Sequence, residues 1–179
     1  IKGTWVNCFG TVTPWNTPIS AEELYFDNSA AWYSMSGAPV QVAKYHGYPT
    51  DGSGDWGNPY DYGYNVEVGV NGTATAADEA NVEVEKRFAL GRFSHENAVV
   101  LPDNRTVLQS DDGSNVVFFK FVADTAGDLS SGTLYAAKMT QAADTSTIAE
   151  ASFAIDWIEL ASATDSEIQG WVAEYDGTY

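Results

Sequence analysis

Short runs of alternating apolar and polar residues, separated by turn-forming residues, dominate the middle of the chain. Turn signals rich in Gly, Asn, Asp and Pro recur about every 8–12 residues, a spacing typical of an all-β sandwich, barrel or propeller. The pattern therefore predicts an all-β fold of antiparallel strands. The runs with the length and composition of strands are residues 64–68, 82–90, 98–101, 106–108, 116–122 and 133–139.

Helical signals are confined to two short segments. Residues 20–24 offer Ser20 as a helix N-cap and Glu23 at the capping-box position, which predicts one helical turn. Residues 162–174 begin with an acidic, cap-like stretch and then place apolar residues at helical spacing, on one face. We therefore expect minor helical insertions in a β fold.

A long segment, residues 43–62, is rich in Gly, Asp, Tyr and Pro and has no strand pattern. Loops of this length in a compact domain are usually functional or covered by a partner element. Within it, residues 51–55 resemble a fragment of a calcium-binding loop, but the closing Glu and the flanking helices of an EF-hand are missing. This is a weak metal signal.

The charge balance excludes some partners. The chain has 25 Asp and Glu and 8 Lys and Arg, which gives a formal net charge of −17. Nucleic acid and anionic membrane surfaces are therefore disfavoured as partners, because proteins bind both through cationic side chains. No apolar run approaches the roughly 20 residues of a membrane helix. The acids are either a solvated surface, a set of metal ligands, or both.

The single cysteine, Cys8, excludes an internal disulfide and leaves the cellular compartment open. The chain begins with Ile1 and shows no basic-then-apolar leader. From this we expect a processed or excerpted piece of a longer protein.

Two acidic pairs could ligate metal. Glu22 and Glu23 follow a Pro-Trp segment, and Asp111 and Asp112 follow a strand-like run. Carboxylate oxygens are the ligands that calcium prefers. Taken alone, however, the glutamates also suit a helix start, and the aspartates are ordinary turn formers.

A third constellation places Arg92, His95 and Glu96 between two strand-like runs. Arg92 offers a planar fork for phosphate or carboxylate. His95 and Glu96 could serve as metal ligands or as acid and base, and a salt bridge of Arg92 with a nearby acid is the structural alternative.

In this order along the chain, these segments resemble the motifs of the PhoX-type alkaline phosphatases. Residues 13–23 are similar to that family's Thr-Pro-Trp-Gly-Thr motif ending in Cys-Glu-Glu, and residues 89–98 to its Ala-Leu-Gly-Arg-Phe-x-His-Glu-x-Ala. Further collinear similarities lie in residues 63–68, 110–122, 132–138 and 156–160. The resemblance thus covers nearly the whole chain.

The resemblance implies part of a β-propeller of several antiparallel blades, in a protein exported to the periplasm or beyond. It implies a cluster of iron and calcium that hydrolyses phosphate monoesters. Family members are longer, so residues 1–179 are expected to form one partial domain, with the remaining blades lying outside this chain or supplied by another chain. The metal ligands carried over are Glu22 or Glu23, Glu96, and Asp111 or Asp112; Arg92 and His95 are catalytic candidates.

One departure changes the expected metal. Ala21 stands where the family has a cysteine that ligates iron. Thiolates suit iron and carboxylates suit calcium, so Ca²⁺ is expected ahead of Fe³⁺, and Cys8 belongs to a separate upstream motif. The expected function is a calcium-dependent phosphoric monoester hydrolase. The alternative is a non-catalytic, calcium-stabilised propeller that acts as a binding or surface-assembly module.

Overall fold

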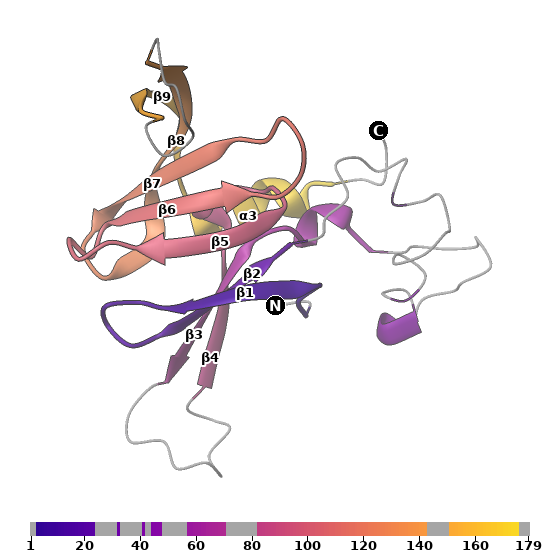
Figure 1. Ribbon diagram of the computed structural model, residues 1–179. Coiled ribbons are helices and arrows are strands. Elements are labelled where there is room, and N and C mark those ends of the chain that lie inside the picture. Colours follow the sequence, from indigo (N-terminus) through magenta and orange to yellow (C-terminus); the bar gives the residue numbers. More distant parts are fainter. Residues whose placement is uncertain are drawn as a thin grey trace.

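A computed structural model describes residues 3–23, 32, 41, 44–47, 57–70, 82–142 and 151–175. In this part of the chain the strands form two antiparallel sheets, which lie one above the other in Figure 1. The predicted all-β class is confirmed. The calcium-loop fragment at residues 51–55 lies outside the described residues.

The first sheet has the order β1-β2-β3-β4. Its strands are β1 (Asn7–Val12), β2 (Pro18–Glu22), β3 (Asn65–Val70) and β4 (Val82–Arg87). The strand patterns predicted β3 and β4, whereas β1 and β2 were not predicted.

The helical turn predicted at residues 20–24 is wrong, because β2 occupies this segment as far as Glu22. An isolated helical turn has an unfavourable nucleation free energy. As a strand, the same residues pair with both β1 and β3 and bury Ile19 and Ala21 on one face. Tertiary pairing therefore overrides the local capping signal.

The second sheet has the order β5-β6-β7-β8-β9, and the predicted runs correspond to β5, β6, β7 and β8, whereas the alternation pattern did not predict β9. Of the two aspartates that suit a turn, Asp111 is the last residue of β6 and Asp112 follows the strand. The strands are β5 (His95–Val100), β6 (Thr106–Asp111), β7 (Phe118–Thr125), β8 (Asp128–Gln141) and β9 (Phe153–Thr164).

Helices are few in the described residues: two 3-10 turns, η1 (Pro59–Asp61) and η3 (Phe88–Leu90), α3 (Asp165–Ala173), and further helical residues at 32, 41 and 44–46. The predicted C-terminal helix is confirmed, and Thr164 with Glu167 forms a capping box at its start. Its apolar side does not enter a core, since α3 has no buried residue. None of the described helices is both long and apolar enough to span a membrane.

The hydrophobic core lies between the two sheets. Ile19 from β2 packs with Ala98 of β5 and with Val107, Phe121 and Leu129 of the second sheet. Strand β1 runs beside β5 (Figure 1), and the Thr11 hydroxyl donates a hydrogen bond to the Ala98 carbonyl at 2.7 Å. This packing brings the ends of β2, β5 and β6 to one place.

Gly132 in β8 is a position where the core admits no side chain. A Cβ there would lie 2.3 Å from the Val122 carbonyl oxygen and 2.5 Å from the Phe121 ring. We expect Gly132→Ala to lower the free energy of unfolding by at least about 2 kcal/mol, because the backbone must shift to admit the methyl group. Urea denaturation measures the change.

Gly170→Ala is the matched control for this prediction. Gly170 lies in α3, and a Cβ there meets no atom within 4 Å. Its replacement should stabilise the helix by about 0.5–1 kcal/mol. Equal effects of the two substitutions would contradict the packing described for β7 and β8.

Candidate functional site

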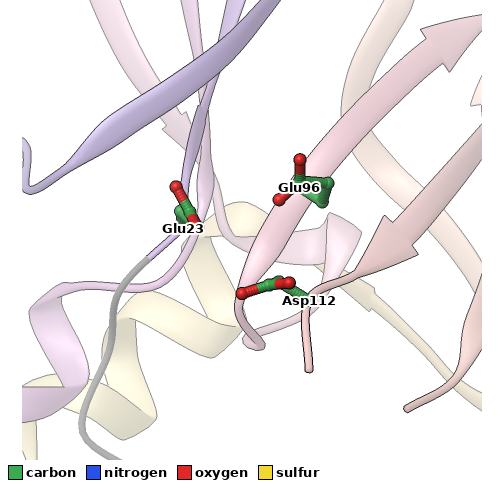
Figure 2. A group of neighbouring side chains, drawn as sticks. All are labelled: Glu23, Glu96 and Asp112. Atoms are coloured by element: carbon green, nitrogen blue, oxygen red, sulfur yellow. The ribbon is translucent and has the colours of Figure 1, made fainter. Parts of the chain in front are cut away.

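Three carboxylates converge where the two sheets meet. Glu23 follows the last residue of β2, Glu96 lies in β5, and Asp112 follows β6; one oxygen of each lies within 4.8 Å of the others. Figure 2 shows the three side chains gathered around one space. Glu23 and Glu96 are partly buried and Asp112 is exposed, so the cluster is reachable from solvent.

The β5–β6 register places two of these acids together. His95 is the Cα partner of Asp111, and the register slips immediately after His95. The amide of Asp112 donates to the Ser94 carbonyl at 2.9 Å, which closes this end of the hairpin. Glu96 and Asp112 each follow one member of the His95–Asp111 pair, so one strand pairing sets the position of both carboxylates.

The third acid, Glu23, comes from the other sheet. Its amide donates to the Val6 carbonyl at 3.1 Å, and its own carbonyl accepts a hydrogen bond from the Ser94 hydroxyl. Ser94 therefore contacts the backbone of Glu23 and also that of Asp112. The site exists only when the two sheets are packed together.

The donor chemistry suits a hard cation. Three carboxylates this close repel one another, and a divalent or trivalent ion bound by their oxygens would relieve the repulsion. The residues present thus fit an oxygen-ligated metal.

Cys8 lies beside this cluster, although the sequence motifs had set it apart. A hydrogen bond to Glu23 raises the pKa of the Cys8 thiol above its usual value, and the charges of Glu23, Glu96 and Asp112 act in the same direction. Cys8 is exposed and follows Asn7, the Cα partner of Glu22. The pairing of β1 with β2 is the signal that would have placed Cys8 next to Glu23, but neither strand was predicted.

Position 21 lies inside the fold. Ala21 is 1% exposed and pairs with Asn65 across β2 and β3. Alternate residues of a strand share a face, so Ala21 lies on the same side as Ile19, which belongs to the core between the sheets. A side chain at position 21 is therefore directed into the interior, and the sulfur beside the carboxylates is that of Cys8.

Glu22, the other member of its pair, is fully buried and lies apart from the three-carboxylate cluster. Its two oxygens accept hydrogen bonds from Lys86 Nζ at 2.9 and 3.1 Å. The backbone amides of Trp5, Gly63 and Tyr64 also donate to it, at 2.8–3.0 Å. This carboxylate joins three segments of the fold as the anion of a buried ion pair.

Asp111 is not among the three converging acids either. It lies in β6, where burial raises the pKa of its carboxyl, while hydrogen bonds from the backbone of Val117 and Ser94 act in the opposite direction. Of the two acidic pairs, the structure brings Glu23 and Asp112 to Glu96.

The two catalytic candidates make contacts within the fold. Arg92 donates to the backbone carbonyls of Tyr62 at 2.8 Å and Pro59 at 3.1 Å, which holds η1 in place. His95 is fully buried, and burial lowers the pKa of its imidazole to about 3. The imidazole is therefore neutral at physiological pH.

Comparison with known proteins identifies a family. The model of a family described as Alkaline phosphatase PhoX matches residues 1–176 of the chain. No curated protein and no solved structure matches it.

The two adjacent glutamates should respond differently to neutralisation. Glu22→Gln leaves the Lys86 ammonium buried without its counter-charge, so we expect the free energy of unfolding to fall by about 3–5 kcal/mol. Glu23→Gln relieves repulsion at a solvent-accessible cluster and should change stability by less than about 1 kcal/mol. Chemical denaturation of the two variants in parallel, without added metal, measures the difference. A smaller loss for Glu22→Gln than for Glu23→Gln would contradict these placements.

Proposed function

Because the chain belongs to the PhoX alkaline phosphatase family, we propose that it acts as a metal-dependent phosphoric monoester hydrolase of the PhoX type. The observation that carries the proposal is the convergence of Glu23, Glu96 and Asp112 from the ends of three strands in two sheets. Family motifs alone left the choice within each acidic pair open. The geometry favours the second member of both pairs.

In this proposal Glu23, Glu96 and Asp112 hold the metal. Their oxygens suit Ca²⁺, which takes several carboxylate ligands in flexible geometry. When bound, such an ion would polarise the phosphoryl oxygens of a phosphate monoester and lower the pKa of a bound water. The three carboxylates would hold the ion, and the exposed Asp112 keeps the cluster accessible to a substrate from solvent.

Cys8 bears on the choice of metal. Its thiol shares the site with the carboxylates and is hydrogen-bonded to Glu23. A thiolate is a soft donor that favours iron over calcium. We propose Ca²⁺ for the oxygen donors, and Cys8 as the residue through which the same site would take Fe³⁺. Ala21 stands where the family motif has its iron-ligating cysteine, and this substitution favours Ca²⁺ over Fe³⁺.

The architecture supports a wider proposal. Successive antiparallel sheets of four and five strands pack together here, as the blades of a propeller do. We propose that they are two blades, with the rest lying outside this chain or supplied by another chain, and that the protein is exported to the periplasm or beyond. Nucleic acid is not proposed as a partner, given the formal net charge of −17.

A second candidate function is a non-catalytic, calcium-stabilised propeller that serves as a binding or surface-assembly module. The observation that favours it is the use of Arg92 and His95 within the fold, where they bond to backbone carbonyls and buried amides. A calcium ion would then link the two sheets through Glu23 on one side and Glu96 on the other.

Hydrolysis of p-nitrophenyl phosphate separates these functions. The protein is assayed with Ca²⁺, with and without iron, and its metal content is measured by elemental analysis. The enzyme proposal expects turnover that is lost on treatment with a chelator and regained when metal is restored. Bound metal without turnover in either condition would exclude the hydrolase and support the structural role.

Neutralising one proposed ligand should weaken metal binding. We expect Glu96→Gln to raise the dissociation constant for Ca²⁺ by about tenfold or more, because one of three charged ligands is lost. Glu83→Gln is the matched control, since Glu83 is an exposed acid of β4 outside the cluster. Isothermal titration measures both. An unchanged calcium stoichiometry and affinity in Glu96→Gln would show that the ligand assignment is wrong.

A further inference from the structure

A buried polar triad lies directly behind the carboxylate cluster. His95, Asn65 and Gln109 are at most 1% exposed, and they come from β5, β3 and β6. The triad thus includes residues of both sheets. Buried polar side chains require hydrogen-bond partners, so their bonds constrain the elements that carry them.

The hydrogen bonds of His95 determine which imidazole nitrogen carries the proton. His95 Nε2 lies 3.1 Å from the Gly91 carbonyl oxygen, which can only accept, so Nε2 carries the proton. Nδ1 then accepts from the Asn65 amide at 3.0 Å. Both nitrogens are engaged inside the fold. This arrangement favours a positioning role for His95 over proton transfer to a substrate.

The chain of bonds continues through the amides. Asn65 Nδ2 also donates to Gln109 Oε1 at 2.7 Å, and Gln109 Nε2 donates to the Leu90 carbonyl at 3.0 Å. Asn65 Oδ1 has no partner among the described residues. Leaving a buried oxygen unpaired costs about 1–3 kcal/mol. The triad is therefore not optimised for stability alone.

The position of the triad relates it to all three acids. His95 precedes Glu96 and pairs with Asp111, the residue before Asp112. Asn65 pairs with Ala21, two residues before Glu23. The hydrogen bond between Asn65 and His95 thus joins the strand that carries Glu96 to the sheet that carries Glu23.

The geometry points to His95, through Asn65 and Gln109, as the positioning residue of the metal site. It sets the separation between Glu23 and the Glu96–Asp112 edge without contacting the ion. The Phe93 ring packs against the imidazole at a tilt of 31°, with centroids 3.7 Å apart, and limits its rotation. The expected effect on metal affinity rests on the proposed function. The positioning of the carboxylates by His95 can be measured in the metal-free protein.

The test compares His95→Leu, which removes both hydrogen bonds, with His95→Gln, whose amide can replace one or both. Leu129→Ala is the control, because Leu129 is a fully buried core residue of β8 outside the triad. The first readout is hydrogen exchange in the metal-free protein, followed at the Asp112 amide, which bonds to Ser94.

We expect His95→Leu to reduce protection of the Asp112 amide by about tenfold more than protection of the Phe121 amide in β7. Leu129→Ala should lower both alike, and His95→Gln should restore much of the difference. Unchanged protection at Asp112, or a loss no larger than in the control, would overturn the inference. If His95→Leu does not fold, Asn65→Ala is judged by the same criterion.

The second readout is Ca²⁺ affinity. Loss of a residue that orients a ligand typically weakens metal binding by about 10–100-fold, so we expect this for His95→Leu and not for Leu129→Ala. If the unaltered protein binds no Ca²⁺, the proposed metal site fails, and the exchange result still decides the positioning role. If the unaltered protein binds Ca²⁺ and His95→Leu binds it equally well, the positioning role fails.

Discussion

The ion pair between Glu22 and Lys86 is the interaction on which the rest of the structure depends. A buried carboxylate is tolerated only with a counter-charge and enough hydrogen bonds to replace water. Glu22 meets that requirement by drawing on Lys86 of β4 and on the amides of Trp5 and Tyr64. One side chain, Glu22, therefore holds together the N-terminal segment, the residues just before β3 and the edge strand β4. Burial lowers the pKa of Lys86 while Glu22 opposes that shift, as expected of a pair that is stable only when both members are present.

The same pair explains why the site forms where it does. With Glu22 held inside, the next residue along the chain is the first that is free to turn outward, and it is Glu23. Its backbone is bonded to Val6 on one side and to Ser94 on the other. The carboxylate consequently meets Glu96 and Asp112 at the edge of the second sheet (Figure 2). One glutamate is held in a buried ion pair and its neighbour joins the carboxylate cluster, and exchanging the two positions would bury a charge that has no partner.

Next to the carboxylate cluster, the contact between the two sheets includes the buried polar triad of His95, Asn65 and Gln109. An all-apolar contact between the sheets would permit small sliding movements, whereas directional hydrogen bonds from His95 to Asn65 and Gly91 allow one arrangement. Metal selectivity depends on ligand geometry as well as ligand type. In the proposed metal site, the neutral, buried imidazole would contribute by positioning the ligands and the exposed thiol of Cys8 by its donor chemistry.

The amino-acid sequence alone predicted the fold class, most strands of the second sheet, the C-terminal helix and the family, because these depend on local periodicity and on collinear motifs. It did not predict β1 and β2, because β2 becomes a strand by pairing with distant β3 and burying Ile19 and Ala21, and β1 in turn pairs with β2. Nor could it choose within the pairs Glu22–Glu23 and Asp111–Asp112. Adjacent acids are chemically equivalent in sequence. Only the packing of the two sheets decides which member of each pair is held by contacts within the fold and which member joins the carboxylate cluster.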